Sequence, residues 1–573
     1  MKHRGLDIVC YAGIVAFVAV FLLVPIWKSL HGAVHDANGW TLFHVMDVFR
    51  DPMLRAGLVN SLIIATATTI LATIIALPVA VVTARCDFRG KTLLSALLLA
   101  PLILPPFVGA IGVEAIIGRT GSLNALLMSL GLLREPIEFF AEGGMPAIIV
   151  MEALNLAPIL SLNLTAALSN LDPALDEAAR NLGAGPWTRF RTITLPLLRP
   201  GFFAGATIVF VWSFTELGTP LMFQFRTVTS VQIFDGLKEV ETSRQPFALT
   251  LVMFTIATAI YLIGRFTLGR SRGTASTKAS IRSVPRQLTR AGTLWAWALL
   301  GGIAFVSCVP HIGVILSALS MPGGWYDRVL PQTWTLDNFA NALQHPLAAG
   351  AIRNSLFLAL SAVVLDIVIG IAAARILVRT KLPARWLLDA LVMLPIAVPG
   401  LVLAFGYISM SLEWPFTPGA PLDFAGNIMG AQPNPFPFLI AAYAMRRLPY
   451  VVRATVAGLE QTPVDLEEAA ASAGAKPWLT MRRIVIPLVF ANVVAGALLA
   501  FSFSMLEVSD SLLLAQRESD FPVTKAIYTL YDRLGDGPAI ASAMGTWAMM
   551  LLGATLVAAS CILGKRMGAM FRA

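Results

Sequence analysis

The sequence predicts an all-α polytopic membrane protein with about twelve transmembrane helices, arranged as two tandem six-helix repeats. The chain has 573 residues, of which 57% are hydrophobic and only 13% are charged. Soluble domains carry roughly 25% charged residues, and a single soluble core stops growing at roughly 250–300 residues. Long apolar runs recur along the chain, and motifs of its first half return in the second. A soluble enzyme, a disordered chain and a nucleic-acid binder are therefore excluded, although the net charge is +9.

Twelve apolar runs are long enough to cross a bilayer, which takes about 20 residues of helix. We expect the first run to be a membrane helix rather than a signal peptide, because no small-residue cleavage motif follows it. The spans expected before residue 270 are 8–27, 58–83, 92–117, 145–168, 200–222 and 246–268. Those expected after residue 290 are 292–318, 354–378, 386–411, 437–458, 491–514 and 540–563.

Basic residues predict the orientation of the chain. In the first half, the N-terminus and the even-numbered connections hold about twice as many Lys and Arg residues as the odd-numbered connections. Because cytoplasmic loops are enriched in Lys and Arg, both termini are predicted to be cytoplasmic. The segment 269–290 has six basic residues, no acidic ones, and many Ser and Thr. We predict that it is a cytoplasmic basic linker between a first domain, 1–268, and a second domain, 291–573.

The second half of the chain repeats the first. Asn60-Ser61 returns as Asn354-Ser355, an offset of 294 residues, and the offset falls to 291 further along. Each half holds six expected spans, so the repeats have parallel topology and are related by a pseudo-twofold axis along the membrane normal. Other matched pairs are Arg85/Arg379, Pro101/Pro395, Pro105/Pro399, Glu177/Glu468, Gly183/Gly474, Pro186/Pro477 and Glu216/Glu507.

The fourth connection of each half is the most informative segment. It reads DEAARNLGAGPWTRFRTITLPLLRP at 176–200 and EEAAASAGAKPWLTMRRIVIPLVFAN at 467–492. Both copies predict a short helix with a face of small residues, a break at Gly, and a second helix that begins near Pro-Trp. Small residues let another protein approach the backbone closely, and the neighbouring arginines hold the segment at the membrane surface.

These two segments resemble the EAA loop of type I ABC importer permeases. The resemblance implies that each loop docks on one of two copies of a separate ABC ATPase, which binds ATP and Mg, while a substrate-binding protein delivers cargo to the outer face. It also implies a multi-pass protein of the bacterial cytoplasmic (inner) membrane that is not itself an enzyme and has no cofactor of its own. The residues that match the family motif are Glu177, Ala178, Ala179 and Gly183 in one loop, and Glu468, Ala469, Ala470 and Gly474 in the other.

The cargo implied by the resemblance is iron(III). Fused halves with P-x-x-x-P in each third span, and with E-L-G or E-V-S in each fifth, resemble the iron(III) permease branch. Thiamine, polyamine or aminophosphonate permeases are similar and remain the alternatives. Residues Arg446, Arg447, Pro449 and Arg453 also resemble that branch, whereas the first half has Asn155 and Leu156 in place of the two adjacent arginines.

Two carboxylates are candidates for the translocation path. Glu216 and Glu507 each lie about 20 residues after the Pro that opens the fifth span, which places them roughly 30 Å along the helix, near the outer leaflet. An ionisable residue at this depth suggests a function, and carboxylates suit a hard cation. The alternative is a helix-end carboxylate in the outer headgroups.

The proline pairs of the third spans have two interpretations as well. They can kink helices that pack against their neighbours, which we expect, or they can break the spans beside the pore. The pairs are Pro101/Pro105 and Pro395/Pro399.

Several other signals are discounted. Arg89-Gly90-Lys91-Thr92 resembles the end of a phosphate-binding loop, but Arg85 stands where that loop needs Gly, so ATP is expected to bind to another chain. The histidines at 31, 35 and 44 lie in an outer loop without a helical pattern, and we expect no metal site there. A secondary transporter is disfavoured because docking loops are present and charges within spans are few. A membrane-embedded enzyme is disfavoured because no catalytic cluster is found.

Overall fold

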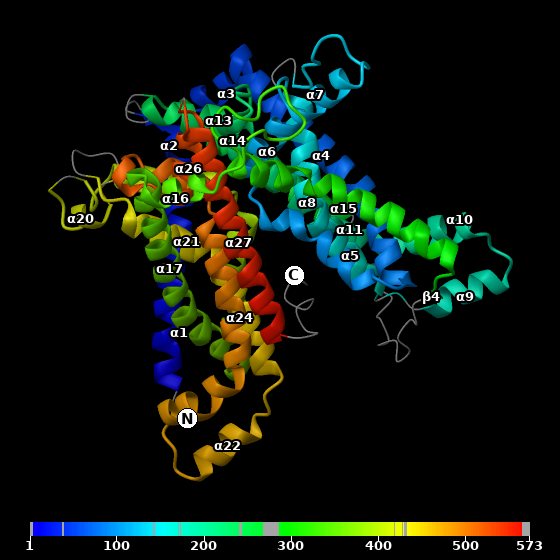
Figure 1. The fold of residues 1–573 in the computed structure, drawn as a ribbon. Helices are drawn as coiled ribbons and strands as arrows, with labels where there is room; N and C mark the ends of the chain where they lie inside the picture. The colour runs from blue at the N-terminus through cyan, green and yellow to red at the C-terminus, as the bar shows by residue number, and fades with distance from the viewer. Residues whose placement is uncertain are drawn as a thin grey trace. The chain divides into compact units, whose positions relative to one another are not determined.

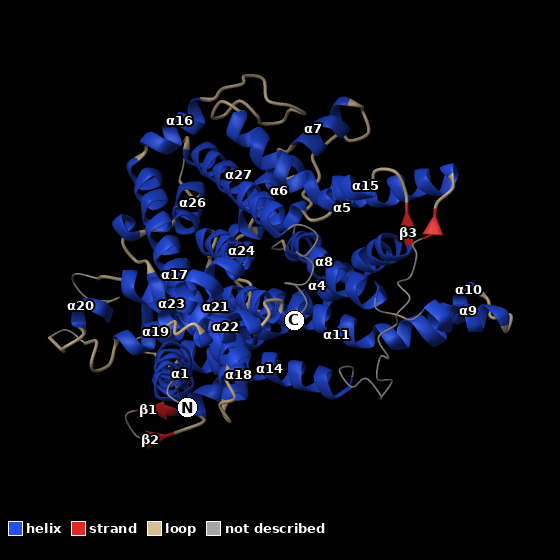
Figure 2. Ribbon diagram, turned by 90° about the horizontal axis from the view of Figure 1, so that it is seen from below, coloured by secondary structure: helices blue, strands red, loops and turns tan. Residues whose placement is uncertain are grey.

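The chain is almost entirely helical in the computed structural model (Figures 1 and 2). The structure describes residues 4–563 except 37–38, 141–143, 170, 172, 240–242, 268–285, 418, 427, 429–432 and 534. The expected linker 269–290 therefore lies outside the described residues, apart from its last five positions. The strands that are described form two ladders of two residues each. They are β1 (His35–Asp36) with β2 (Gly39–Trp40), and β3 (Cys86–Asp87) with β4 (Arg286–Gln287).

The chain folds into two compact units, which we call unit 1 and unit 2. Unit 1 comprises Met1–Val48, Ile233–Leu251 and Asp337–Met570, and unit 2 comprises Phe49–Gln232, Val252–Leu336 and Phe571–Ala573. The expected domains 1–268 and 291–573 describe the sequence repeats, and the compact units cut across them. The first span of each repeat belongs to the unit that holds most of the other repeat.

Unit 2 holds the second to fifth spans of the first repeat and the first span of the second. Its helices are α4 (Pro52–Arg85), α5 (Lys91–Leu97), η2 (Ala100–Ile103), α6 (Pro106–Ile117), α7 (Ser122–Ser129), α8 (Met145–Ser169), α9 (Pro173–Asn181), α10 (Pro186–Arg189), η3 (Phe190–Thr194), α11 (Leu195–Phe214), α12 (Gly218–Met222) and α15 (Arg290–Leu319). Helices α3 (Phe43–Arg50), α13 (Thr229–Asp235) and α14 (Gln245–Thr267) run across the division between the units.

Unit 1 holds the first span of the first repeat and the remaining spans of the second. Its helices before residue 412 are α1 (Arg4–Val18), η1 (Ala19–Leu23), α2 (Val24–Val34), η4 (Gly236–Glu239), α16 (Asp337–Gln344), α17 (Pro346–Arg379), α18 (Arg385–Ala397) and α19 (Gly400–Ser411). The later ones are α20 (Asp423–Gly426), α21 (Phe436–Glu460), α22 (Asp465–Ser472), α23 (Pro477–Thr480), η5 (Met481–Val485), α24 (Ile486–Met505), α25 (Ser509–Leu514), η6 (Glu518–Asp520), α26 (Val523–Tyr531) and α27 (Gly537–Leu563).

The number of apolar spans is slightly lower than the twelve expected. Within the described residues, nine helices are long and apolar enough to cross a membrane, and two bent helix pairs raise the number to eleven. The remaining expected span, 437–458, is a continuous helix of 25 residues, α21. This helix is more charged than the other spans because it carries Arg446, Arg447 and Arg453. The protein is therefore all-α and polytopic, as predicted, and one of its long helices is unusually charged.

The third span of each repeat is broken, so the expected kink is wrong. The two segments of the pair Lys91–Ile103 and Pro106–Ser129 are bent by 101°, and those of Arg385–Ile396 and Gly400–Ser411 by 100°. Pro105 and Pro399 stand at the N-caps of the second segments, α6 and α19. Proline cannot donate a backbone hydrogen bond and disfavours a helical conformation at the residue before it, so Pro105 and Pro399 each end one helix and start another.

The repeated Asn-Ser pair makes the same hydrogen bonds in both units. Asn60 Nδ2 donates to the Thr227 carbonyl at 2.8 Å, and Asn354 Nδ2 donates to the equivalent Phe521 carbonyl at 3.2 Å. The hydroxyls of Ser61 and Ser355 accept from the backbone N–H groups of residues 229 and 523, at 3.0 and 2.8 Å. Each pair thus satisfies polar backbone groups at the start of a short helix, α13 or α26, beside the second span, so the repeat extends to individual hydrogen bonds.

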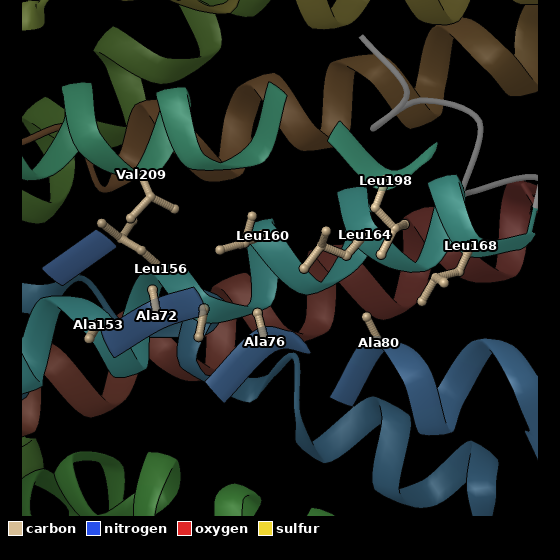
Figure 3. Close-up of a cluster of buried hydrophobic side chains, with 11 residues drawn as sticks. Ala72, Ala76, Ala80, Ala153, Leu156, Leu160, Leu164, Leu168, Leu198 and Val209 are labelled. Carbon is tan, nitrogen blue, oxygen red and sulfur yellow. The ribbon is translucent and has the colours of Figure 1, made fainter. Parts of the chain in front are cut away.

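Small residues allow the second, fourth and fifth spans of unit 2 to pack closely. Ala72, Ala76 and Ala80 recur every fourth residue of α4, which puts them on one face of the helix. They form a buried cluster with leucines of α8 and with residues of α11 (Figure 3). Close approach through small side chains is the usual way for helices to associate in a bilayer, where the hydrophobic effect between helices is absent.

Glycines accommodate the exchanged first spans. A Cβ at Gly112 of α6 would overlap the Pro310 carbonyl oxygen of α15, and a Cβ at Gly406 of α19 would overlap the Pro25 carbonyl oxygen of α2. Gly112 and Gly406 are equivalent positions of the two repeats. The first span of each repeat therefore crosses, at backbone distance, the broken third span of the other.

We predict that Gly112→Val destabilises unit 2, because the backbone of α15 must move away. Overpacking of this kind costs about 1–3 kcal/mol. Gly302→Val is the matched control, since that glycine also lies in α15 and has open space around its Cβ position. The measurement is thermal stability of the purified protein in detergent. Equal melting temperatures for the two variants would contradict the close crossing.

Candidate functional site

The first EAA loop consists of two short helices joined by a glycine turn. Helix α9 ends at Asn181, and Gly183 follows with φ of +81°. The N–H of Ala184 donates to the Ala179 carbonyl and the N–H of Gly183 to the Arg180 carbonyl, both at 3.0 Å. These two bonds form the Schellman arrangement, which needs a left-handed residue after the helix and therefore favours glycine.

The second EAA loop has the same geometry. Gly474 has φ of +80° and follows α22. The N–H of Ala475 donates to the Ala470 carbonyl and the N–H of Gly474 to the Ala471 carbonyl, again both at 3.0 Å. The predicted break at Gly183 and Gly474, between two short helices, is confirmed, and both glycines adopt a positive φ. A Cβ at either glycine meets nothing within 4 Å, so the backbone conformation alone requires glycine.

Both loops present apolar and aromatic side chains to the surroundings. Leu182 is 88% exposed, and Trp187 and Trp478, at equivalent positions, are each 71% exposed. The motif residues are on the surface too: Glu177, Ala178, Glu468 and Ala469 are exposed, and Ala179 and Ala470 are half-buried. In Figure 1, α9 and α10 lie at one end of the helices of unit 2, and α22 lies at one end of those of unit 1. Exposed apolar patches on a projecting loop are typical of protein interaction sites.

Each loop continues directly into the fifth span of its repeat. Helix α10 passes through the π-helical turn η3 into α11, and α23 passes through η5 into α24 in the same way. The second helix of each loop is therefore the beginning of a long helix, Pro186–Met222 or Trp478–Met505. A displacement of the loop would be carried along this helix to its other end.

Glu216 and Glu507 lie just beyond the far ends of α11 and α24. The Ser230 hydroxyl donates to the Glu216 carbonyl and the equivalent Thr524 hydroxyl to the Glu507 carbonyl, both at 2.6 Å. The Glu216 carboxylate is half-buried and accepts from the N–H of Thr219 at 3.3 Å, at the start of α12. The backbone around the two carboxylates is thus held alike in the two repeats.

The environment of the second carboxylate differs from that of the first. Glu507 is buried and forms ion pairs with Arg446, at 2.9 Å, and with Arg447. Arg446 also lies 3.6 Å from the Asp510 carboxylate. The alternative of a solvated helix end therefore does not describe Glu507, which belongs to a buried cluster of two arginines and two carboxylates on α21 and around α25.

In the first repeat the position of Arg446 is occupied by Asn155. The Asn155 amide donates to the carbonyls of Pro101 and Leu104, at 2.8 and 3.1 Å, and so binds the backbone where the third span breaks. Arg446 lies beside Gly400, the first residue after the corresponding break, where a Cβ would overlap its guanidinium. The same position of the fourth span thus lies at the break in both repeats, with an amide that binds the backbone in the first and a guanidinium paired with Glu507 in the second.

Three buried carboxyl groups are not among the residues predicted from the sequence. Glu152 is buried and accepts a hydrogen bond from the Ser213 hydroxyl. Asp366 in α17 is fully buried, as is Asp510. The signal that identifies Glu152 and Asp366 is an acidic residue within a predicted span, 145–168 or 354–378.

The described residues contain no group of three or more His, Cys, Asp or Glu side chains that could hold a metal ion. His31 and His35 stack on each other with ring centroids 4.8 Å apart, and Trp40 packs edge-on against both. His44 lies 3.9 Å from Asp36. In this part of the chain the imidazoles take part in an aromatic cluster.

We predict that Arg447→Leu destabilises the protein, because it leaves part of the charge of Glu507 buried without a partner. Breaking a buried ion pair costs about 3–5 kcal/mol. Adding Glu507→Gln to Arg447→Leu should restore much of the lost stability, since the charges of the remaining Arg446 and Asp510 then balance. The measurement is thermal unfolding of the purified variants in detergent. A double variant less stable than the single one would contradict the pairing.

Comparison with known proteins identifies the family. The model of the binding-protein-dependent transport system inner membrane component matches residues 72–270 and 366–569, which begin at equivalent positions of the two repeats. A putative ferric transport system permease protein of Haemophilus influenzae is 27% identical over 524 residues, which cover 88% of this chain and 77% of the relative. A ferric transport system permease protein of Actinobacillus pleuropneumoniae is 25% identical over 570 residues, covering 96% of this chain and 77% of the relative.

A shorter relative matches a single repeat. A molybdenum transport system permease protein of Azotobacter vinelandii is 31% identical over 217 residues, which cover 36% of this chain and 93% of the relative. The family model, in contrast, matches both halves of the chain and more than half of its length. The chain is therefore a multi-pass transport subunit that belongs to the family of binding-protein-dependent transport system inner membrane components.

Proposed function

We propose that this chain forms the translocation path of an ABC importer for iron(III), and that two copies of a separate ATPase drive it. The observation that carries the proposal is the pair of projecting EAA loops, which have the same glycine turn, the same hydrogen bonds and the same exposed tryptophan. The ATP and Mg of the cycle belong to the ATPase, and this chain supplies the path.

The loops have the properties of a docking element. Ala178, Ala179, Ala469 and Ala470 give each first helix a face on which a partner can approach the backbone. Leu182, Trp187 and Trp478 offer apolar area that docking would bury, and burial of apolar surface stabilises a complex by about 25 cal/mol per Å². Since both loops lie on connections predicted to be cytoplasmic, the ATPases would bind at the cytoplasmic face of the inner membrane, where both termini would also lie.

The continuous helices explain how docking would change the path. ATP binding that moves a loop also moves the start of α11 or α24, because no break separates the loop from the fifth span. The other ends of these helices position Glu216 and Glu507, the candidate path residues. A switch between inward-open and outward-open states would therefore rearrange the carboxylates that we place on the path.

Two observations favour iron(III) as the cargo, namely the relatives and the carboxylates. The two relatives named as ferric transport permeases cover 88% and 96% of this chain, both repeats included. Carboxylate oxygens are suitable ligands for hard cations. Glu216 gives the first repeat an acidic group at its predicted outer end, while the arginines of the second repeat balance Glu507. A binding protein would deliver the cation to this face.

We predict that the double variant Gly183→Val and Gly474→Val remains inserted and abundant but loses the ATPase and ATP-driven iron uptake. A side chain at positive φ costs about 1–2 kcal/mol per site, which twelve packed helices can tolerate. The docking surface is smaller and depends on the shape of the turn. The measurements are co-purification of the ATPase with tagged permease and uptake of radiolabelled iron into vesicles that contain both proteins and the loaded binding protein.

Two control variants separate the effect of backbone strain from the effect of side-chain bulk. Gly185 lies in the same loop with φ of −66° and open space around it, so Gly185→Val should be mild. Gly183→Asn should also be mild, because Asn tolerates the left-handed conformation. Full ATPase recovery in the double valine variant would contradict the docking role. Wild-type vesicles that retain the ATPase and transport thiamine or a polyamine instead of iron would contradict only the cargo.

A further inference from the structure

The two EAA loops are attached to the membrane helices by different contacts. Each second span ends in an arginine, Arg85 or Arg379, at equivalent positions of the repeats. The Arg379 guanidinium makes three hydrogen bonds. Its Nε donates to the Glu467 carboxylate at 2.7 Å, and its Nη2 donates to the carbonyls of Leu459 and Thr462, at 3.1 and 2.8 Å.

Arg379 ends α17, and its three acceptors lie in α22 and at the end of α21. Leu459 and Thr462 lie at and just beyond the C-terminal end of α21, where backbone carbonyls have no partner within the helix. Glu467 lies in α22, the first helix of the second EAA loop. A cation at the C-terminus of a helix is also favoured by the helix dipole. One guanidinium, only 11% exposed, thus joins the second span, the fourth span and the coupling loop.

Arg85 makes a different contact in the first repeat. Its Nη2 donates to the Thr194 hydroxyl at 3.0 Å, which joins the second span to the fifth rather than to α9. Asp176, the equivalent of Glu467, pairs with Arg189 of α10 at 2.7 Å, a residue of the loop itself. Glu467 therefore joins the second loop to the second span, whereas the equivalent Asp176 joins the two helices of the first loop to each other.

We propose that Arg379 is a positioning residue that fixes the second EAA loop to the membrane helices, so that the two loops transmit ATPase motion unequally. The proposal rests on the proposed docking of an ATPase at each loop. Motion of α22 is passed to α17 and α21 through the guanidinium as well as to α24 through the chain. Motion of α9 is passed to α11 through the chain and through the pair of Asp176 with Arg189, a contact that stays within the loop and its own helix.

The attachment itself can be tested without the ATPase. Leu466 of α22 and Leu175 of α9 occupy equivalent positions and are 43% and 48% exposed, so a spin label at either site serves as a matched probe. Labels are attached to Leu466→Cys or Leu175→Cys after replacement of Cys10, Cys86, Cys308 and Cys561. In lipid nanodiscs, Arg379→Gln should mobilise the label at 466, whereas Arg85→Gln should leave the label at 175 unchanged. Equal changes for the two variants, or no change for either, would overturn the proposal.

A second arm measures coupling as iron transported per ATP hydrolysed. Loss of the charged hydrogen bond to Glu467 frees α22 from α17 and α21, so Arg379→Gln should lower this ratio on the order of tenfold, while Arg85→Gln stays near the wild type. Arg379→Lys should give an intermediate ratio, because an ammonium keeps the charge but cannot reproduce the planar fork. Equal ratios for the Gln variants would contradict unequal coupling. A wild-type protein that neither binds the ATPase nor takes up iron would contradict the proposed function instead, and the spin-label result would still decide whether Arg379 holds the loop.

Discussion

The bilayer requires every backbone polar group of a spanning segment to find a partner within the protein. This constraint confines irregular backbone to the ends of helices and to breaks that other side chains can satisfy. The features singled out above lie at such places. The EAA loops satisfy the ends of α9 and α22 with glycine turns, Asn155 binds the carbonyls exposed by the break before α6, and Arg379 binds carbonyls at the end of α21.

The two repeats share a backbone plan and differ in the charges placed on it. The turns at Gly183 and Gly474 and the bonds of Asn60 and Asn354 are nearly the same in both. At the end of the fifth span farther from the EAA loop, in contrast, Arg446 and Arg447 balance Glu507 where the first repeat has an amide and an apolar residue. A duplicated scaffold with unequal charges is well suited to a path whose two halves act differently on one cargo.

Much of the fold could be predicted from the sequence, because long apolar runs and repeated motifs depend on local composition. The helices and both EAA turns follow from residues near one another in the chain, and the repeat follows from a comparison of its two halves. The exchange of the first spans could not be predicted, since it depends on which faces pack, and Gly112 and Gly406 signal it only once α15 and α2 are placed. The breaks at Pro105 and Pro399 share their sequence pattern with kinks, so composition alone could not separate the two.

The candidate site could be predicted only in part, because some of its residues form a local motif and others depend on contacts between distant segments. The loop residues 177–183 and 468–474 form a local motif, whereas the partners of Glu507 and Arg379 come from helices that are distant in sequence. Arg85 and Arg379 look alike in the sequence until their acceptors, Thr194 and Glu467, are known. Long-range ion pairs are therefore the part of the site that only the structure could supply.

The central claim, that the EAA loops receive the ATPase, is tested most directly by photo-crosslinking in native membranes. A photoreactive amino acid replaces Trp187 or Trp478 in separate variants and, as a control, the 72% exposed Trp40 of the predicted outer loop. The account predicts a crosslink to the ATPase from both loop positions and none from position 40. Absence of an ATPase crosslink from both loops, or an equal crosslink from position 40, would contradict it.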